Sequence, residues 1–157
     1  MRKLLSGGLV VFGIASLPVP LSTRSIPERP KHEYTSDPRL KTLHHFFAQA
    51  ECPAASYAIE FLRVADEYAL DWRLLPSLSF IESTGGKASL HNNLFGWDEG
   101  RARFASPLAA IQSVGSRLAE SALYRSKSLD EILAIYNPND DYAQKVKSVM
   151  RRIASVQ

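Results

Sequence analysis

Apolar residues recur at helical spacing through almost the whole segment from Leu40 to Val156, and this pattern limits what the chain can fold into. In residues 40–50, for example, Leu43, Phe46 and Phe47 fall on one face of a helix. No segment alternates apolar and polar residues strongly enough to predict a strand. Segments with helical spacing are 40–50, 54–70, 71–83, 106–124, 128–136 and 140–156. The sequence therefore predicts one mainly α-helical domain.

Helix-capping residues support these boundaries. Ser128 followed three residues later by Glu131 is a capping-box pattern. For the last helix, Asp140 or Asp141 is the expected N-cap. The Gly85–Gly86 pair should end the third helix, because residues just after a helix often adopt positive φ. Residues 88–104 follow no helical pattern and predict a loop-rich or small β excursion.

The N-terminus differs in composition from the rest. A basic start, Met1–Lys3, precedes an uncharged apolar run that is interrupted by glycines and is short for a membrane span. This pattern predicts a secretory signal peptide and export to the periplasm or the extracellular envelope, with an uncleaved anchor as the alternative. We expect no stable membrane span after cleavage. The predicted organisation is a signal peptide at 1–23, a polar linker at 24–38 and a folded domain at 39–157.

Charge and cysteine content narrow the function classes. The formal net charge of +3 falls to +1 once Arg2 and Lys3 leave with the signal, so nucleic acid is not an expected partner. The single cysteine, Cys52, allows no internal disulfide and is expected to be a small buried residue. Because no cysteine–histidine spacing suggests a metal site, we predict no metal and no cofactor. We expect a monomer.

A lone acid, Glu82, ends the apolar helix in the stretch "SFIESTGGKASLHNNLFGWDEG" (79–100). A carboxyl in an apolar wall has a raised pKa and can stay protonated near neutral pH. Such a group can act as the general acid that cleavage of a glycosidic bond requires. The alternative is that Glu82 only caps its own loop.

The loop after Glu82 carries side chains suited to sugar binding. Amides of Asn92 and Asn93 could bond to hydroxyl and acetamido groups, and Asn92 could instead serve only as a turn residue. The rings of Phe95 and Trp97 could stack on sugar faces, although Phe95 could equally belong to the core.

Three motifs occur in a fixed order, "FIESTGGK", "NNLFGW" and "IYNPNDDYAQKVKSVM". In this order they resemble the lysozyme-like superfamily, most closely the bacterial glucosaminidase (mannosyl-glycoprotein endo-β-N-acetylglucosaminidase) family, with similarity to lytic transglycosylases. The resemblance covers about Cys52 to Ile153. It implies a lysozyme-like helical domain that hydrolyses the β-1,4 linkage of N-acetylated glycans, peptidoglycan first among them.

The resemblance also implies roles for individual residues. Glu82 matches the general acid, while Asn93, Phe95 and Gly96 match the family's Asn-x-Phe-Gly loop. Tyr136 matches a late tyrosine that orients the acid or contacts the substrate acetamido group. The resemblance thus predicts that Glu82 and Tyr136 are catalytic and that the loop residues Asn93, Phe95 and Gly96 bind substrate.

Two departures from the family patterns leave the subclass open. Trp97-Asp98 stands where glucosaminidases commonly have Ile-Lys. Asn137, a further candidate for substrate binding, is shared only with the transglycosylases, and Pro138 follows it where they have alanine. Lytic transglycosylase activity, or glycan binding without catalysis in the envelope, are therefore the alternatives.

A hydrolase can use a second carboxylate as base or nucleophile. Asp98 and Glu99 are the nearest candidates in the sequence, and their alternative is a solvated turn that ends at Gly100. The substrate's own N-acetyl or hydroxyl group could replace a second acid.

Overall fold

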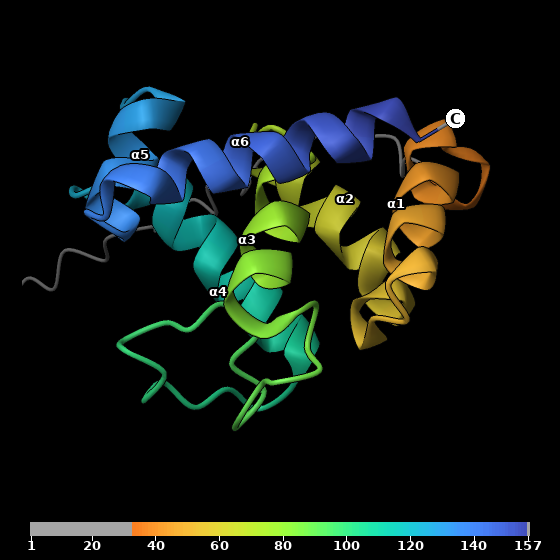
Figure 1. Ribbon diagram of the computed structural model, residues 1–157, viewed down its shortest axis with the longest axis horizontal. Coiled ribbons are helices and arrows are strands. Elements are labelled where there is room, and N and C mark those ends of the chain that lie inside the picture. Colours follow the sequence, from red (N-terminus) through yellow and green to blue (C-terminus); the bar gives the residue numbers. More distant parts are fainter. Residues whose placement is uncertain (1–32, 157) are drawn as a thin grey trace, which may run out of the picture. The chain divides into compact units, whose positions relative to one another are not determined.

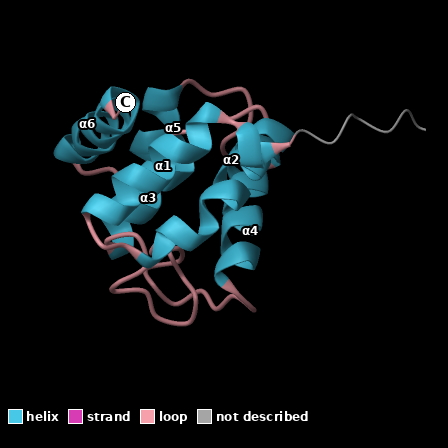
Figure 2. Ribbon diagram, turned by 90° about the vertical axis from the view of Figure 1, so that its right-hand side faces the viewer, coloured by secondary structure: helices cyan, strands magenta, loops and turns pink. Residues whose placement is uncertain are grey.

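The structure, a computed structural model, describes residues 33–156 of the 157. The predicted signal peptide lies outside the described residues, as does most of the predicted linker. The described chain is mainly helical and contains no strand (Figures 1 and 2). Its elements are η1 (Tyr34–Ser36), α1 (Pro38–Gln49), η2 (Pro53–Tyr57), α2 (Ala58–Glu67), α3 (Leu74–Ser83), α4 (Pro107–Glu120), α5 (Leu129–Tyr136) and α6 (Asp140–Ser155). The predicted mainly α fold is confirmed, and residues 88–104 form loop and turns rather than β structure.

Helix α3 forms the centre of the core. Its apolar residues Leu74, Leu75 and Leu78 are buried, and even Ser77 and Ser79 are inaccessible to solvent. A helix that is apolar almost all round is stable only when other elements enclose it. Helix α6 crosses over α3 and also contacts α5 and α1 (Figure 1). The residues before and after α3 are thereby fixed relative to the rest of the domain.

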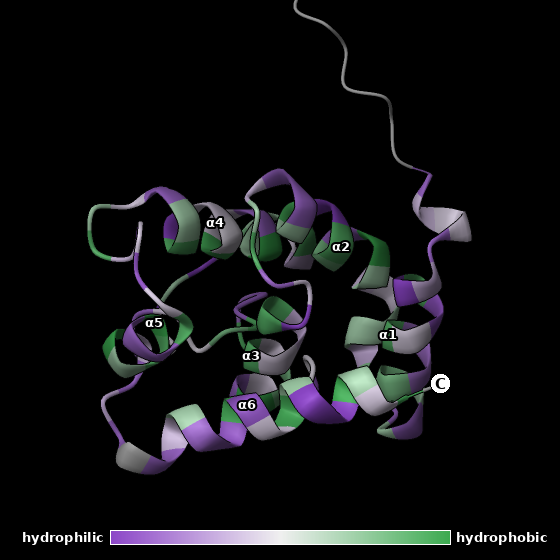
Figure 3. Cartoon of the chain, turned by 90° about the horizontal axis from the view of Figure 1, so that it is seen from above, coloured by the Kyte–Doolittle hydropathy of each residue, from purple (hydrophilic) through white to green (hydrophobic). Residues whose placement is uncertain are grey.

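Helix α6 is amphipathic, and hydrophobic and hydrophilic residues alternate around it in Figure 3. Its predicted core face is confirmed, since Val146, Val149, Met150 and Ile153 are buried. The loop that connects α3 to α4 extends from the domain at the C-terminal end of α3 and the N-terminal end of α4 (Figures 1 and 2). This loop carries most of the residues predicted to bind substrate.

Helices α2 and α4 pack closely at Gly115. A Cβ atom at this position would lie 2.2 Å from Cγ1 of Val64, much closer than any real contact. The other near atoms, on Leu75 and Tyr68, would be at ordinary distances of 3.4 and 3.6 Å. The spacing of the two helices therefore depends on the missing side chain of Gly115.

The packed part of the chain begins before Arg39, the first residue of the predicted folded domain. Asp37 caps α1 by accepting a hydrogen bond from the Arg39 backbone N–H at 2.8 Å. The Arg39 guanidinium also pairs with Asp66 at 2.8 Å, and the Tyr34 hydroxyl donates to Asp66. The end of the predicted linker is therefore tied to α2, a long-range contact that local composition does not reveal.

Two helix ends differ from the predictions. The N-cap of α6 is Asn139, whose Oδ1 accepts from the Asp141 backbone N–H at 3.0 Å, so the expected Asp140 or Asp141 cap is wrong. An extended backbone at Asn139 lets the helix begin one residue earlier. Helix α3 is followed by Thr84, which already has a positive φ of 52°, ahead of the predicted glycine pair. By contrast, the capping box of Ser128 and Glu131 is confirmed.

The turn after α3 packs against Cys52, which is buried as predicted. Gly85 has a φ of 59°, and a Cβ atom there would lie 2.7 Å from Cβ of Cys52. The Gly85 carbonyl oxygen also accepts a hydrogen bond from the Ala54 backbone N–H at 2.9 Å. The C-terminal end of α3 is therefore held in a fixed position, and Glu82 lies in its last turn.

Candidate functional site

Glu82 is half-buried, and two distant parts of the chain fix its carboxyl group. Tyr142 on α6 donates a hydrogen bond from its hydroxyl to Glu82 Oε1 at 2.6 Å. On the other side, a Cβ atom at Gly96 would lie 2.7 Å from Glu82 Oε2, so a side chain at this position would displace that oxygen. Burial raises the pKa of Glu82 above its ordinary value of 4.5, and the Tyr142 hydrogen bond opposes part of that rise.

A pocket of about 140 Å³ lies in front of Glu82. Leu90, 70% exposed, supplies an apolar rim. Its lining residues come from the end of α3 and the following loop: Glu82, Ser83, Ala88, Leu90, Asn93, Gly96 and Gly100. Among these, Glu82 is the only one that ionises. The pocket therefore presents one carboxyl group among small, apolar and amide groups.

Ser83 and Asn93 tie the loop back to α3 and to itself. The Ser83 hydroxyl donates to the Leu94 carbonyl oxygen at 2.8 Å and accepts from the Gly86 N–H at 3.0 Å. The Asn93 side chain donates to the Trp97 carbonyl oxygen at 2.9 Å and accepts from the Trp97 N–H at 3.0 Å. Since Asn93 is only 4% exposed and bonds to its own loop, it shapes the pocket wall rather than offering a free amide.

The other predicted sugar-binding residues divide into structural and accessible ones. Phe95 is fully buried and belongs to the core, which was the alternative for it. The Asn92 amide donates to the Phe104 carbonyl oxygen at 2.9 Å and joins the middle of the loop to its C-terminal part. Asn137 accepts at Oδ1 from the Asn139 N–H and belongs to the turn between α5 and α6. Of the two aromatic candidates, Trp97 alone has a partly exposed ring.

The aromatic rings beside Glu82 form one stack. Tyr136 lies parallel to Tyr142, with ring centroids 6.0 Å apart, and meets Trp97 edge-on at 5.5 Å. The Tyr136 hydroxyl donates to the Phe95 carbonyl oxygen at 2.6 Å. Tyr136, predicted to orient the acid, therefore holds the loop, while its stacking partner Tyr142 holds Glu82.

Tyr142 was not among the residues that the sequence singled out. It lies within the third motif and precedes Val146 by one helical turn, so it belongs to the apolar face of α6. The sequence signal that could have identified Tyr142 is a tyrosine on the core face of a predicted helix, close to a predicted turn. Because burial and the neighbouring Glu82 raise its pKa far above the usual range, Tyr142 stays protonated and acts as a hydrogen-bond donor.

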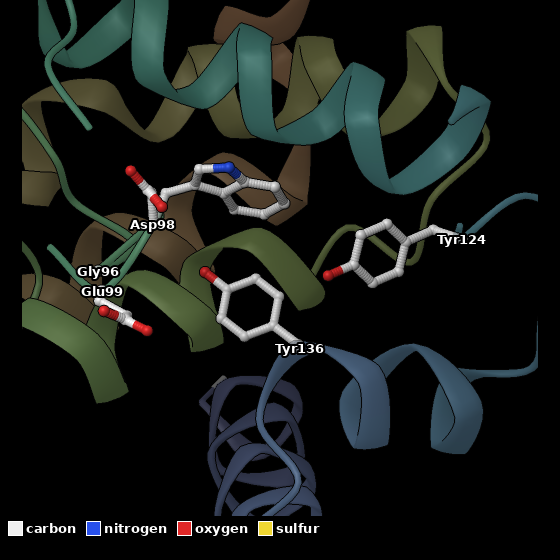
Figure 4. Close-up of a pocket in the computed structure, with 6 residues that line it drawn as sticks. Gly96, Asp98, Glu99, Tyr124 and Tyr136 are labelled. Carbon is white, nitrogen blue, oxygen red and sulfur yellow. The ribbon is translucent and has the colours of Figure 1, made fainter. Parts of the chain in front are cut away.

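Asp98 and Glu99 lie outside the Glu82 pocket. They line a neighbouring hollow of about 130 Å³ together with Gly96, Trp97, Tyr124 and Tyr136 (Figure 4). Both are exposed and form ion pairs with Arg101, at 3.1 Å from Asp98 and 3.4 Å from Glu99. The solvated turn proposed as their alternative agrees with this exposure.

Replacing Tyr142 by Phe is expected to raise the pKa of Glu82 further. The substitution removes the one hydrogen bond that favours the charged carboxylate, while burial remains. The measurement is a titration of the Glu82 carboxyl carbon by NMR in wild type and variant. Tyr136→Phe is the matched control, because its hydroxyl bonds to Phe95 instead. An unchanged or lowered pKa in Tyr142→Phe would contradict the arrangement.

Residues 33–156 contain neither a cluster of metal-ligating side chains nor a membrane-spanning helix. In this part of the chain, no three His, Cys, Asp or Glu side chains come together as a metal site would require. Nor does any of the described helices have both the length and the apolarity needed to cross a bilayer.

Comparison with known proteins gives no relative from which to assign a family. No protein-family model, curated protein or solved structure matches this chain. The resemblance of the three motifs to the glucosaminidases therefore stays a prediction.

Proposed function

We propose that this protein is a glycosidase that cleaves the β-1,4 linkage of N-acetylated glycans, with peptidoglycan as its first candidate substrate. The observation that carries the proposal is Glu82 itself. Its carboxyl group is half-buried, has a raised pKa and borders an open pocket. A carboxyl with a raised pKa at the edge of a pocket is suited to general acid catalysis of glycoside cleavage.

The contacts of Glu82 indicate which oxygen would deliver the proton. Oε1 accepts the hydrogen bond from Tyr142, which leaves Oε2 to carry the proton in the protonated form. Oε2 lies in the space left open by Gly96. From there the proton would pass to the glycosidic oxygen as the bond to the anomeric carbon breaks, and the resulting carboxylate would then serve as the base.

The Glu82 pocket has no second carboxylate among its lining residues, which supports routes in which the substrate completes the reaction. In one route the N-acetyl oxygen attacks the anomeric carbon, and water later opens the ring so formed. In the other, the 6-hydroxyl of the muramic residue attacks the anomeric carbon while Glu82 takes its proton. The second route is that of a lytic transglycosylase, which is the second candidate function.

Export would bring the protein to its substrate. The signal peptide predicted at 1–23 implies delivery to the periplasm or the cell envelope, where peptidoglycan is located. The remaining alternative, glycan binding without cleavage, uses the same pocket and differs only in the fate of the bond.

The test is digestion of purified peptidoglycan by the protein, with Glu82→Gln as the inactive control and mass spectrometry of the products. Reducing N-acetylglucosamine ends identify a glucosaminidase, whereas anhydro-muramic ends identify a lytic transglycosylase. Reducing muramic ends would assign the enzyme to the muramidases. Intact polymer with both proteins, together with binding to the polymer, would contradict catalysis and leave glycan binding.

A further inference from the structure

A third hollow lies between the loop and α4 and has a volume of about 170 Å³. Two arginines, Arg103 from the loop and Arg117 from α4, take part in its lining. The full set of lining residues is Trp97, Ala102, Arg103, Phe104, Ser113, Val114 and Arg117. The set combines two positive charges with two aromatic rings and includes no acid.

Among residues 33–156, the Arg117 guanidinium has an aromatic contact but no counter-ion. Its central carbon lies 5.6 Å from the centroid of the Trp97 ring, within the range of a cation–π contact. No other described side chain forms an ion pair or hydrogen bond with it. By contrast, Arg39, Arg63 and Arg73 each pair with a carboxylate. All the hydrogen-bond donors of the Arg117 side chain are therefore available to a ligand.

Arg103 also lacks a carboxylate partner among residues 33–156. Its Nη1 lies 3.1 Å from Nε2 of His91, a group that is neutral or positive but never negative. Two guanidinium groups thus border one hollow with no negative charge in its lining. Planar guanidinium groups bind carboxylates through paired hydrogen bonds.

The basic hollow adjoins the candidate site through shared wall residues. Trp97 lines both the basic hollow and the hollow of Asp98 and Glu99. Gly96 in turn lines that hollow and the Glu82 pocket. The three hollows are therefore neighbours along the loop, and an extended polymer that occupies the Glu82 pocket could also reach the two arginines.

We propose that Arg103 and Arg117 bind a carboxylate carried by the glycan strand and so select strands that contain muramic acid. The identity of the strand rests on the proposed function. Each muramic residue carries a lactyl group, which is a free carboxylate in stripped strands and bears a carboxylate-containing peptide in intact ones. Chitin strands have the same N-acetylated backbone but no carboxylate, and the arginines would gain nothing from them.

The test is calorimetric binding to the full-length Glu82→Gln protein, which should not cleave its ligands. The three probes are chitotetraose, a glucosaminyl-muramic tetrasaccharide with free lactyl groups, and the same tetrasaccharide with stem peptides. We expect an acidic probe to bind about tenfold more tightly than chitotetraose, since a charge-assisted hydrogen bond contributes on this scale. Adding Arg103→Gln and Arg117→Gln together should abolish the difference.

Arg151→Gln is the matched control, because Arg151 is an exposed arginine of α6 outside all three hollows. Preference for the free lactyl probe identifies the lactyl carboxylate, and preference for the peptide probe alone identifies the stem. Equal affinity for all three probes would overturn the proposal. So would a preference for an acidic probe that persists in the double variant, provided that its melting temperature shows it to be folded. The binding result is independent of the digestion result, so failure of catalysis and failure of this pocket are distinguishable.

Discussion

Replacing Glu82 by Gln is expected to lower the cleavage rate by about 10²–10⁴-fold, the usual contribution of a general acid. The amide cannot donate an acidic proton to the glycosidic oxygen. Its oxygen can still accept the Tyr142 hydrogen bond, so the surroundings of residue 82 should be preserved. Release of soluble fragments from peptidoglycan, followed against time, measures the loss. Cleavage at the wild-type rate would contradict the role of Glu82.

The same substitution should stabilise the fold at neutral pH. Since the pKa of Glu82 is raised in the folded protein, the folded state binds more protons than the unfolded state above pH 4.5. Wild-type stability therefore falls as the pH rises from 4.5 through the raised pKa, whereas the Gln variant lacks this loss. Melting temperatures should coincide below pH 4.5 and separate above it, with Glu82→Gln higher.

A second acid serves as the matched control for this stability effect. Glu120→Gln makes the same chemical change at an exposed position, the end of α4. If the melting temperatures of wild type and Glu82→Gln coincide at every pH, the carboxyl group is not destabilised by burial.

Replacing Gly115 by Ala is expected to destabilise the protein by about 1–3 kcal/mol, as overpacking of a close helix contact does. On an exposed helix the change would be favourable by about 1 kcal/mol, because alanine has the better helix propensity. Here the added methyl group would lie 2.2 Å from Val64 Cγ1, and α2 and α4 would have to separate. Denaturant unfolding measures the free energy change.

The sign should reverse when Val64 is shortened. Val64→Ala removes the Cγ1 atom and leaves space at the contact, at the usual cost of a core truncation. In that background the next nearest neighbours of the Gly115→Ala methyl group, on Leu75 and Tyr68, lie at 3.4 and 3.6 Å, so the substitution should be neutral or stabilising. A destabilisation of equal size in both backgrounds would show that the contact with Val64 is not the cause.

The helices could be predicted from the sequence because their signals are local. The apolar face of α6 and the capping box of Ser128 and Glu131 lie within a few turns of chain. The N-cap at Asn139 was missed, because Asp140 and Asp141 are equally good capping residues and the backbone conformation decides among them. Residue type alone does not fix that conformation.

The candidate site was only partly predictable for a different reason. The apolar setting of Glu82 follows from its own helix, and its raised pKa agrees with that expectation. Whether Tyr136 or Tyr142 reaches the carboxyl group depends on how α5 and α6 pack against α3. Likewise, Asn93 looks free in the sequence but bonds to the backbone of its own loop. Such non-local geometry leaves no local pattern in the sequence.

The carboxyl group of Glu82 acquires its properties from segments that join it only when folding is complete. The loop lines the pocket and Tyr142 belongs to the last helix, so an unfolded chain lacks the burial that raises the pKa of Glu82. In that state Glu82 is an ordinary surface acid, ionised near neutral pH. If the proposed function holds, the general acid therefore exists only in the complete fold, and a chain that lacks the loop or α6 should not cleave glycans.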